Sequence, residues 1–203
     1  MKKIVRLFWI ITALMLMFYA GVLIADKQAL QTQIIRMHVI ADSDNSQDQA
    51  VKLAVRDVLI QHLQAILRDV TDVSSVKSIL IQELDVLEKL ANQTLATLDS
   101  NDSATVILLQ EEFDRREYDT FSLPAGIYES LCVRIGSGEG KNWWCVVFPS
   151  LCIPTTPDGF EATAVSSGFE EGLAGALSKN GSHTFRFYLL DCIGRIENFL
   201  NIS

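Results

Sequence analysis

A glycine-rich stretch followed by two tryptophans is the part of the sequence whose residue types could do specific chemistry. It comprises, in order, Gly136, Gly138, Gly140, Lys141, Asn142, Trp143 and Trp144. Alternate glycines before a lysine suggest a phosphate-binding loop, but that motif needs a glycine where the chain has Ile135 and a serine or threonine where it has Asn142. The dinucleotide-binding pattern also fails, because its third glycine would come one residue later. We therefore interpret the stretch as a shaped turn between two strands.

The strand that follows the glycines carries two adjacent tryptophans. Successive side chains of a strand point to opposite faces of a sheet, so Trp143 and Trp144 cannot share one face. If only one face is covered, one ring stays near the surface, where tryptophan is typical of protein contact sites. If helices cover both faces, both rings serve the core.

An uncharged segment near the N-terminus predicts membrane targeting. Residues 7–25 carry no charge and are long enough to cross a bilayer as a helix, with Lys2, Lys3 and Arg6 before them and Asp26 after them. The positive-inside rule then places the body of the chain outside the cell that makes it. Because a cleaved signal usually has a shorter apolar core, we expect a retained anchor, with cleavage as the alternative. The body keeps 14 of the 17 basic residues against all 25 acidic ones, which excludes nucleic-acid binding.

The chain has four cysteines, which an exported protein can oxidise. Cys145 and Cys152 enclose a short loop, and a disulfide between them would stabilise the fold by roughly 2.5 kcal/mol in a chain-entropy model. Cys132 falls in an apolar strand and Cys192 on the apolar side of a helix, so we expect both as buried thiols. Zinc is disfavoured, because neither a CxxC pair nor a nearby histidine accompanies Cys145 or Cys152. We expect no metal and no other cofactor.

A thiol hydrolase of the cell envelope is an alternative that the cysteines leave open. Cys145 would be its nucleophile, and His38, His62 or His183 its general base. Each histidine also has a purely structural interpretation, on a strand face, on a helix and in a loop respectively. A peptidoglycan-binding module is a third possibility.

An acidic turn precedes the first long amphipathic helix. The turn containing Asp44 begins like a calcium loop, but the positions that need glycine and glutamate hold glutamine and leucine. We expect instead that Ser46 and Gln49 form a capping box, and that carboxylates such as Asp48 favour the positive end of the helix.

The polar side of this helix, at residues 47–67, carries charges one turn apart. Asp48, Lys52 and Arg56 follow one another at i, i+4 steps, which predicts a solvated face. A contact from Arg56 to the acidic turn or to a partner is the alternative.

Hydrophobic periodicity predicts an α+β fold, with a small, mainly antiparallel sheet packed with a two-helix hairpin and a C-terminal helix, all preceded by the N-terminal membrane helix. The expected strands are residues 33–40, 104–109, 127–135 and 143–148. The paired helices are residues 47–67 and a second helix that follows residues 72–75 and ends at residues 99–103, with its apolar stripe from Leu80 to Leu98. The last two strands should form a hairpin through the glycine turn, and residues 111–119 a charged connection. We expect residues 1–26 as anchor or signal, 27–153 as the exported domain, 154–183 as a glycine- and proline-rich connection, and 184–203 as a closing strand or helix.

Two blocks of the chain resemble the stage II sporulation protein R family. The first, HVIADSDNSQDQAVKLAVRD, matches the pattern V-I-A-x-S-D, then D-Q, then K, then V-R-D. It contains the polar residues Asp44, Asp48, Gln49, Lys52, Arg56 and Asp57. The second, LPAGIYESLCVRIGSGEGKNWWCVVFPSLC, holds the core G-x-G-x-N-W-W-C-x-x-F-P-x-L-C. The chain departs from the family pattern at Asp42, where asparagine is expected, and in the region after Cys152.

The resemblance implies a signalling role. Members of the family are made in the forespore and exported into the space between the two membranes, where they trigger the membrane protease of the mother cell that removes the pro-sequence of sigma-E. The family is not known as an enzyme, so we expect no catalytic residues. We expect the partner contact at residues 136–144, with Lys141, Asn142 and one of the tryptophans as anchors.

Overall fold

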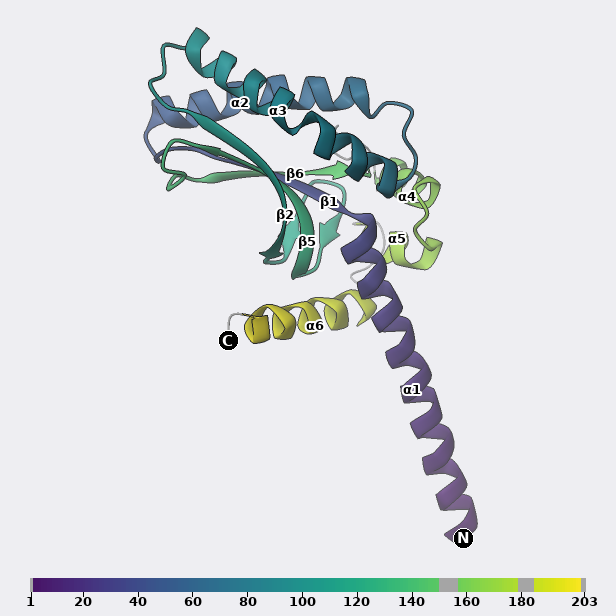
Figure 1. The fold of residues 1–203 in the computed structure, drawn as a ribbon. Coiled ribbons are helices and arrows are strands. Elements are labelled where there is room, and N and C mark those ends of the chain that lie inside the picture. Colours follow the sequence, from purple (N-terminus) through teal and green to yellow (C-terminus); the bar gives the residue numbers. More distant parts are fainter. Residues whose placement is uncertain (1, 150–156, 179–184, 202–203) are drawn as a thin grey trace.

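The computed structural model describes residues 2–149, 157–178 and 185–201 (Figure 1). Helix α1 (Lys2–Gln33) projects from the rest of the molecule, with the N-terminus at its far end. The uncharged segment at residues 7–25 forms most of this helix, which is long and apolar enough to cross a membrane. Because α1 continues past that segment, the first strand begins at Ile35 rather than at residue 33.

Four strands form the main sheet, in the spatial order β2 (Ala104–Phe113), β5 (Gly126–Ile135), β1 (Ile35–Ile40) and β6 (Asn142–Phe148). Strand β1 runs parallel to β5 and antiparallel to β6, while β2 runs antiparallel to β5. All six residues of β1 are buried, which suits a central strand. The prediction that β5 and β6 pair as a hairpin is therefore wrong, because β1 lies between them.

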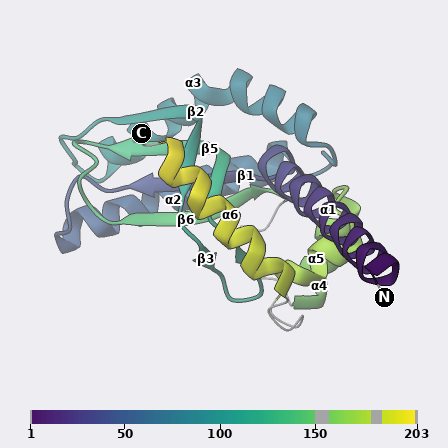
Figure 2. The ribbon, with the colours of Figure 1, turned by 90° about the horizontal axis from the view of Figure 1, so that it is seen from below.

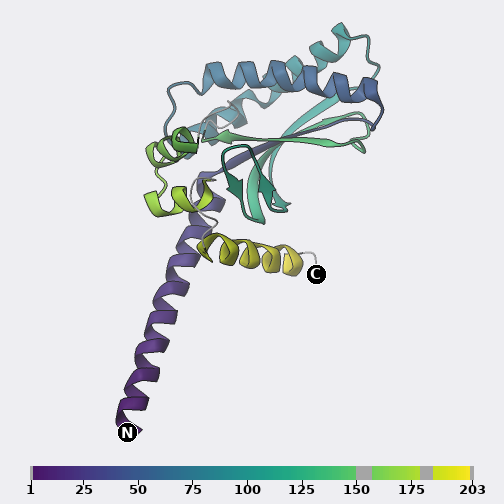
Figure 3. The same ribbon diagram turned by 180° about the vertical axis from the view of Figure 1, so that it is seen from behind.

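Helices α2 (Ser46–Ile66) and α3 (Val73–Thr97) cover one face of the sheet (Figures 1 and 3). Their apolar stripes follow the predicted spacing, and the residues that they bury include Val55, Leu59, Leu63, Leu80, Leu87, Ala91 and Leu95. These side chains pack against Met37 of β1 and Val133 of β5. Burial of a leucine of this kind contributes roughly 1.5–3 kcal/mol. The predicted helix hairpin is confirmed.

A second apolar cluster lies on the opposite face of the sheet. The elements that build it are β4 (Ser122–Leu123), α4 (Pro157–Ser166), α5 (Glu171–Leu177), α6 (Phe185–Asn201) and the last turns of α1. Strand β3 (Arg116–Glu117) pairs with β4. Its buried side chains include Phe113, Phe121, Tyr128, Phe160, Leu173, Leu177 and Phe187. Both faces of the sheet are therefore packed, and the fold is α+β as predicted.

Two segments that we expected as connections contain regular structure. Strand β2 continues through Glu111 to Phe113, because these residues pair with residues 126–128 of β5 at the edge of the sheet. Residues 157–178 form α4 and α5, which bury aromatic and aliphatic side chains despite their glycines. One thiol prediction fails as well, since Cys132 is buried but Cys192 is exposed on α6.

Candidate functional site

The loop between β5 and β6, residues 136–141, passes over the C-terminal end of β1. It cannot be a tight hairpin turn, because β1 separates the two strands that it joins. The chain leaves β1 at the same end, through residues 41–45, and enters α2. We call residues 136–141 the crossing loop and residues 41–45 the acidic turn, and the two segments meet there.

Hydrogen bonds tie the crossing loop to the acidic turn. The loop donates from Ser137 N to Asp42 Oδ1 (2.6 Å), from Ser137 Oγ to Asp42 O (3.0 Å), from Glu139 N to Asp42 O (3.2 Å), from Gly140 N to Ala41 O (2.9 Å) and from Lys141 N to Asp44 Oδ1 (2.7 Å). The hydrogen bonds from the Ser137 backbone and side chain lower the pKa of Asp42. The two segments therefore hold each other in one conformation.

The glycines make this close approach possible. Gly136 and Gly138 adopt positive φ angles of 58° and 67°, a region that favours glycine. Gly140 lies so close to the acidic turn that a Cβ atom there would overlap the backbone carbonyl of Ser43. The interpretation of the stretch as a shaped turn is thus confirmed, although the strands that it joins are not neighbours.

Lys52 of α2 lies beneath the crossing loop. Its ammonium group donates to Gln49 Oε1 (2.6 Å) and to the backbone oxygen of Lys141 (2.7 Å), while Gln49 Nε2 donates to the backbone oxygen of Ser43 (2.9 Å). Only 4% of Lys52 is exposed, and burial lowers its pKa. The predicted solvated face is therefore wrong at this position, because the loop covers it.

The helix cap differs from the predicted capping box. Asn45 is the N-cap of α2 and accepts from the backbone amide of Asp48 (2.8 Å). Asp48 in turn accepts from the Ser43 hydroxyl (2.6 Å) and from Asn45 Nδ2 (2.8 Å). Gln49 cannot complete a capping box with Ser46, because its side chain already binds the acidic turn.

The outer surface of the crossing loop presents polar side chains. Lys141 and Asn142 are exposed, and the Lys141 ammonium group lies 3.7 Å from Asp44 Oδ2. Next to them, Trp143 is half-buried against the cluster under α2 and α3, and the Arg56 guanidinium stacks on its ring at 4.9 Å. Arg56 also pairs with the exposed Asp57 (2.6 Å).

Trp144 points to the opposite face of the sheet, as strand geometry predicted for neighbouring residues. Its ring stacks on His38 (4.8 Å between centroids), meets Phe113 edge-on (5.3 Å) and lies under the Arg116 guanidinium (4.5 Å). Trp144 is therefore part of the second apolar cluster, and it does not join the surface formed by Lys141, Asn142 and Trp143.

A polar group that the sequence did not predict as a group lies beside Trp144. His38 Nε2 is 2.9 Å from Glu111 Oε2, and the Cys132 sulfur is near both, with the three potential ligand atoms within 4.8 Å of one another. Such a set could hold a soft metal ion, but His38 and Glu111 already satisfy each other as an ion pair. Burial disfavours the imidazolium, yet the hydrogen bonds with Cys132 and Glu111 outweigh it and raise the pKa of His38 to about 9.

This pKa predicts stability that decreases as the pH rises. Because the folded-state pKa of His38 lies above the ordinary 6.5, the ion pair contributes about 3 kcal/mol at most, all of it present below pH 6.5 and lost as the pH rises through about 9. Urea unfolding in detergent at pH 6.5 and pH 9.5 measures the difference. His38→Gln should remove most of it, whereas His62→Gln, at a more exposed pair with Glu83, should not. An unchanged pH dependence in His38→Gln would contradict this assignment.

Among the residues that the structure describes, those of the thiol hydrolase hypothesis do not lie together. Cys145 faces the cluster under α2 and α3, while His38 lies on the other face of the sheet. His62 pairs with Glu83 at 2.9 Å. Cys132 does lie near His38, but only 2% of Cys132 and 4% of His38 are exposed, which leaves a substrate no access to the sulfur. His183 and Cys152 lie outside the described residues, so the Cys145–Cys152 disulfide stays a prediction.

The crossing loop thus gathers most of the residues that the sequence singled out. Gly136, Gly138, Gly140 and Lys141 lie in it, and Asn142 directly follows it. Asp44 and Lys52 bind it, Asp48 and Gln49 bind the neighbouring acidic turn, and Trp143 and Arg56 lie alongside. Ser137, whose hydroxyl group links the two segments, and Ser43, whose hydroxyl group donates to Asp48 of α2, were not among the predicted residues. Serine next to aspartate in a turn is a usable signal for such bonds, but it does not identify a partner far along the chain.

Comparisons with known proteins match the part of the chain that contains the crossing loop and the acidic turn. The model of the family described as Stage II sporulation protein R matches residues 31–157, which include the acidic turn, α2 and the crossing loop. Stage II sporulation protein R of Bacillus subtilis (strain 168) is 32% identical over 120 residues, which are 59% of this chain and 54% of that relative, so the chain aligns with about half of the relative's length. No solved structure matches the chain. On the family match, which covers more than half of its residues, the chain belongs to the stage II sporulation protein R family.

Proposed function

We propose that this protein is an exported sporulation signal that activates a membrane-embedded protease, which then removes the pro-sequence of sigma-E in the mother cell. Family membership supports the sporulation role, and the apolar helix α1 fits a membrane anchor or an export signal. In this proposal the protein itself is not a catalyst. It acts from the intermembrane space, on the outward-facing part of the protease.

The crossing loop is the observation that carries the proposal. Its backbone is held by hydrogen bonds to the acidic turn, so the exposed Lys141 and Asn142 side chains project from a fixed base. A rigid base lowers the entropy that a contact residue loses on binding. Trp143 and Arg56 add a half-buried aromatic ring and a cation beside it, residue types that dominate protein contacts.

Alanine substitution of Lys141 tests the contact. In cells that produce this protein with its cognate protease and the sigma-E precursor, Lys141→Ala should slow precursor processing about tenfold, as loss of an interface anchor of about 1.4 kcal/mol would. The matched control is Lys89→Ala, which removes an exposed lysine from α3, away from the loop. Both variants should keep the wild-type circular dichroism spectrum.

Two results would count against the contact surface. Processing at the wild-type rate in Lys141→Ala, with normal amounts of protein, would show that this side chain makes no productive contact. Equal losses in Lys141→Ala and Lys89→Ala would point to a general effect of charge instead.

A further inference from the structure

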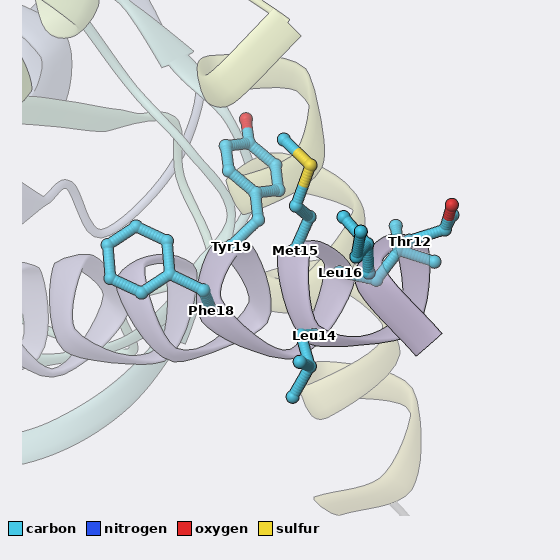
Figure 4. A pocket seen from close by; sticks show the side chains of 7 residues that line it. Thr12, Leu14, Met15, Leu16, Phe18 and Tyr19 are labelled. Atoms are coloured by element: carbon cyan, nitrogen blue, oxygen red, sulfur yellow. The ribbon is translucent and has the colours of Figure 1, made fainter. Parts of the chain in front are cut away.

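The apolar part of α1 ends where the helix meets the body of the molecule. From Ile4 to Phe18 its large apolar side chains are exposed, whereas Leu23, Asp26 and Leu30 are buried against other elements. A shallow hollow on this segment is lined by α1 alone, and Figure 4 shows side chains such as Phe18 and Tyr19 projecting from it. With α1 retained in a bilayer, the uncharged segment ends at residue 25, and Asp26 marks the outer surface of the hydrocarbon.

Two ion pairs bind α6 to α1 at this level. The Arg186 guanidinium donates to both carboxylate oxygens of Asp26 (2.6 and 2.7 Å), and the Lys27 ammonium lies 2.7 Å from Glu197. Gln31 also donates to Glu197 (3.0 Å). At about 1.5 Å of rise per residue, residues 26–31 span only about 7.5 Å of α1, so both ends of α6 are held to one short stretch of that helix.

Helix α6 consequently runs across the direction of α1, on the side of the sheet from which α1 projects (Figures 1 and 3). In the view from below, the N-terminus of α1 is the part nearest to the viewer, and α6 lies in front of the sheet (Figure 2). A bilayer spanned by α1 would therefore have its surface next to α6.

The two faces of α6 differ in their surroundings. One face packs on the body through Phe187 and Leu190, and Gly194 lies so close to Ala125 that a Cβ atom there would overlap its backbone. The outer face carries apolar side chains one turn apart, which are Phe185, Tyr188, Ile196, Phe199 and Leu200, with 71% of Phe185 and 73% of Phe199 exposed. Since the inner face meets the sheet, this outer stripe points away from it, toward the side where α1 extends.

We propose that α6 lies in the interfacial layer of the membrane that α1 spans, with its outer face buried among phospholipid headgroups and the first carbons of their acyl chains. Large aromatic and aliphatic residues on one face of a helix that lies flat are typical of such interfacial helices. The exposed Arg195, paired with Asp191 (2.9 Å), sits on this outer side, where lipid phosphates attract cations. We assign lipid rather than a protein as the partner of this outer face, because its apolar stripe continues the exposed apolar surface of α1.

The exposed Cys192 on the outer face of α6 provides the probe for a test. The full-length protein would be reconstituted into vesicles of phosphatidylethanolamine and phosphatidylglycerol, with the fluorophore NBD on Cys192 and the site of labelling verified by mass spectrometry. Lipids with a nitroxide near the headgroup should quench this fluorophore several-fold more than lipids with a nitroxide at the acyl terminus. The control carries NBD on Gln82→Cys in a Cys192→Ser background, since residue 82 is exposed on α3, and it should not be quenched.

A second variant separates lipid contact from the folding of α6. Ile196→Glu with Phe199→Glu places two carboxylates on the outer stripe, and this should reduce the quenching at Cys192 to the level of the control, without changing the helix content. The proposal would be overturned if the fluorophore on Cys192 were quenched no more than the fluorophore at position 82 of the control. It would also be overturned if the double variant were quenched at Cys192 as strongly as the parent protein. Neither outcome bears on the proposed signalling function, which is tested separately by measuring the processing of the precursor.

Discussion

Alanine in place of Gly140 should destabilise the protein by about 1–3 kcal/mol, the usual cost of forcing extra atoms into a packed site. The new Cβ atom would overlap the carbonyl group of Ser43 and lie 2.9 Å from the backbone oxygen of Ala41. Both obstacles are backbone atoms, so neither can rotate away as a side chain would. The loop would have to move, and its hydrogen bond from Gly140 N to Ala41 O would lengthen or break. Urea unfolding of the protein in detergent measures the loss.

Gly175→Ala is the matched control for this substitution. Gly175 lies inside α5, and a Cβ atom there would meet nothing within 4 Å. Because alanine favours a helix more than glycine does, by about 1 kcal/mol, this variant should be as stable as the parent or slightly more so. If Gly140→Ala and Gly175→Ala had the same free energy of unfolding, the crossing loop would not be in contact with the acidic turn as described. Under the proposed function, cells that carry the Gly140→Ala variant should also process the sigma-E precursor more slowly.

Methionine in place of Lys52 should cost about 2 kcal/mol, although it replaces a charged residue by an apolar one of similar length. The ammonium group donates to the backbone oxygen of Lys141 and to Gln49, and its removal leaves these acceptors covered and unpaired. An unsatisfied buried acceptor costs about 1–3 kcal/mol. Part of this cost is offset, because the substitution also removes a buried charge. Burial disfavours the charged form of Lys52 and lowers its pKa. The free energy of unfolding from urea titration gives the net effect.

Lys77→Met makes the same chemical change at an exposed ion pair. The Lys77 side chain is 47% exposed and lies 2.9 Å from Glu129, and surface pairs of this kind contribute about 0–1 kcal/mol. We expect Lys52→Met to lose clearly more stability than Lys77→Met. Equal losses would show that Lys52 does not hold the crossing loop from below.

The periodic parts of the fold could be predicted from sequence. The apolar spacing of α2 and α3 is regular over several turns, and Leu59, Leu80 and Leu87 are buried where that spacing placed them. The opposite directions of Trp143 and Trp144 follow from strand geometry alone. The glycine turn was also recognisable, because glycine at three alternate positions weakens a regular helix or strand and favours a turn.

The order of the strands could not be predicted, and most errors at the site follow from it. Neighbouring strands in the chain usually pair, but β1 enters between β5 and β6 and displaces the loop onto the start of α2. Lys52 shows the consequence, since helix periodicity assigns it to the polar side and only the distant loop covers it. The pair of His38 and Glu111 could not be predicted for the same reason, because the strand order brings together two side chains that are 73 positions apart in the sequence.

The central position of β1 also bears on how the chain reaches its folded state. β1 is the first strand of the sheet in the sequence, yet both of its neighbours, residues 129–134 and 142–148, belong to the far end of the sheet region. Contacts between such distant segments form slowly, because a long loop must close before they contribute. A chain that crosses a membrane from its N-terminus would therefore stay unfolded until nearly all of the sheet has emerged, a state that suits a translocation channel.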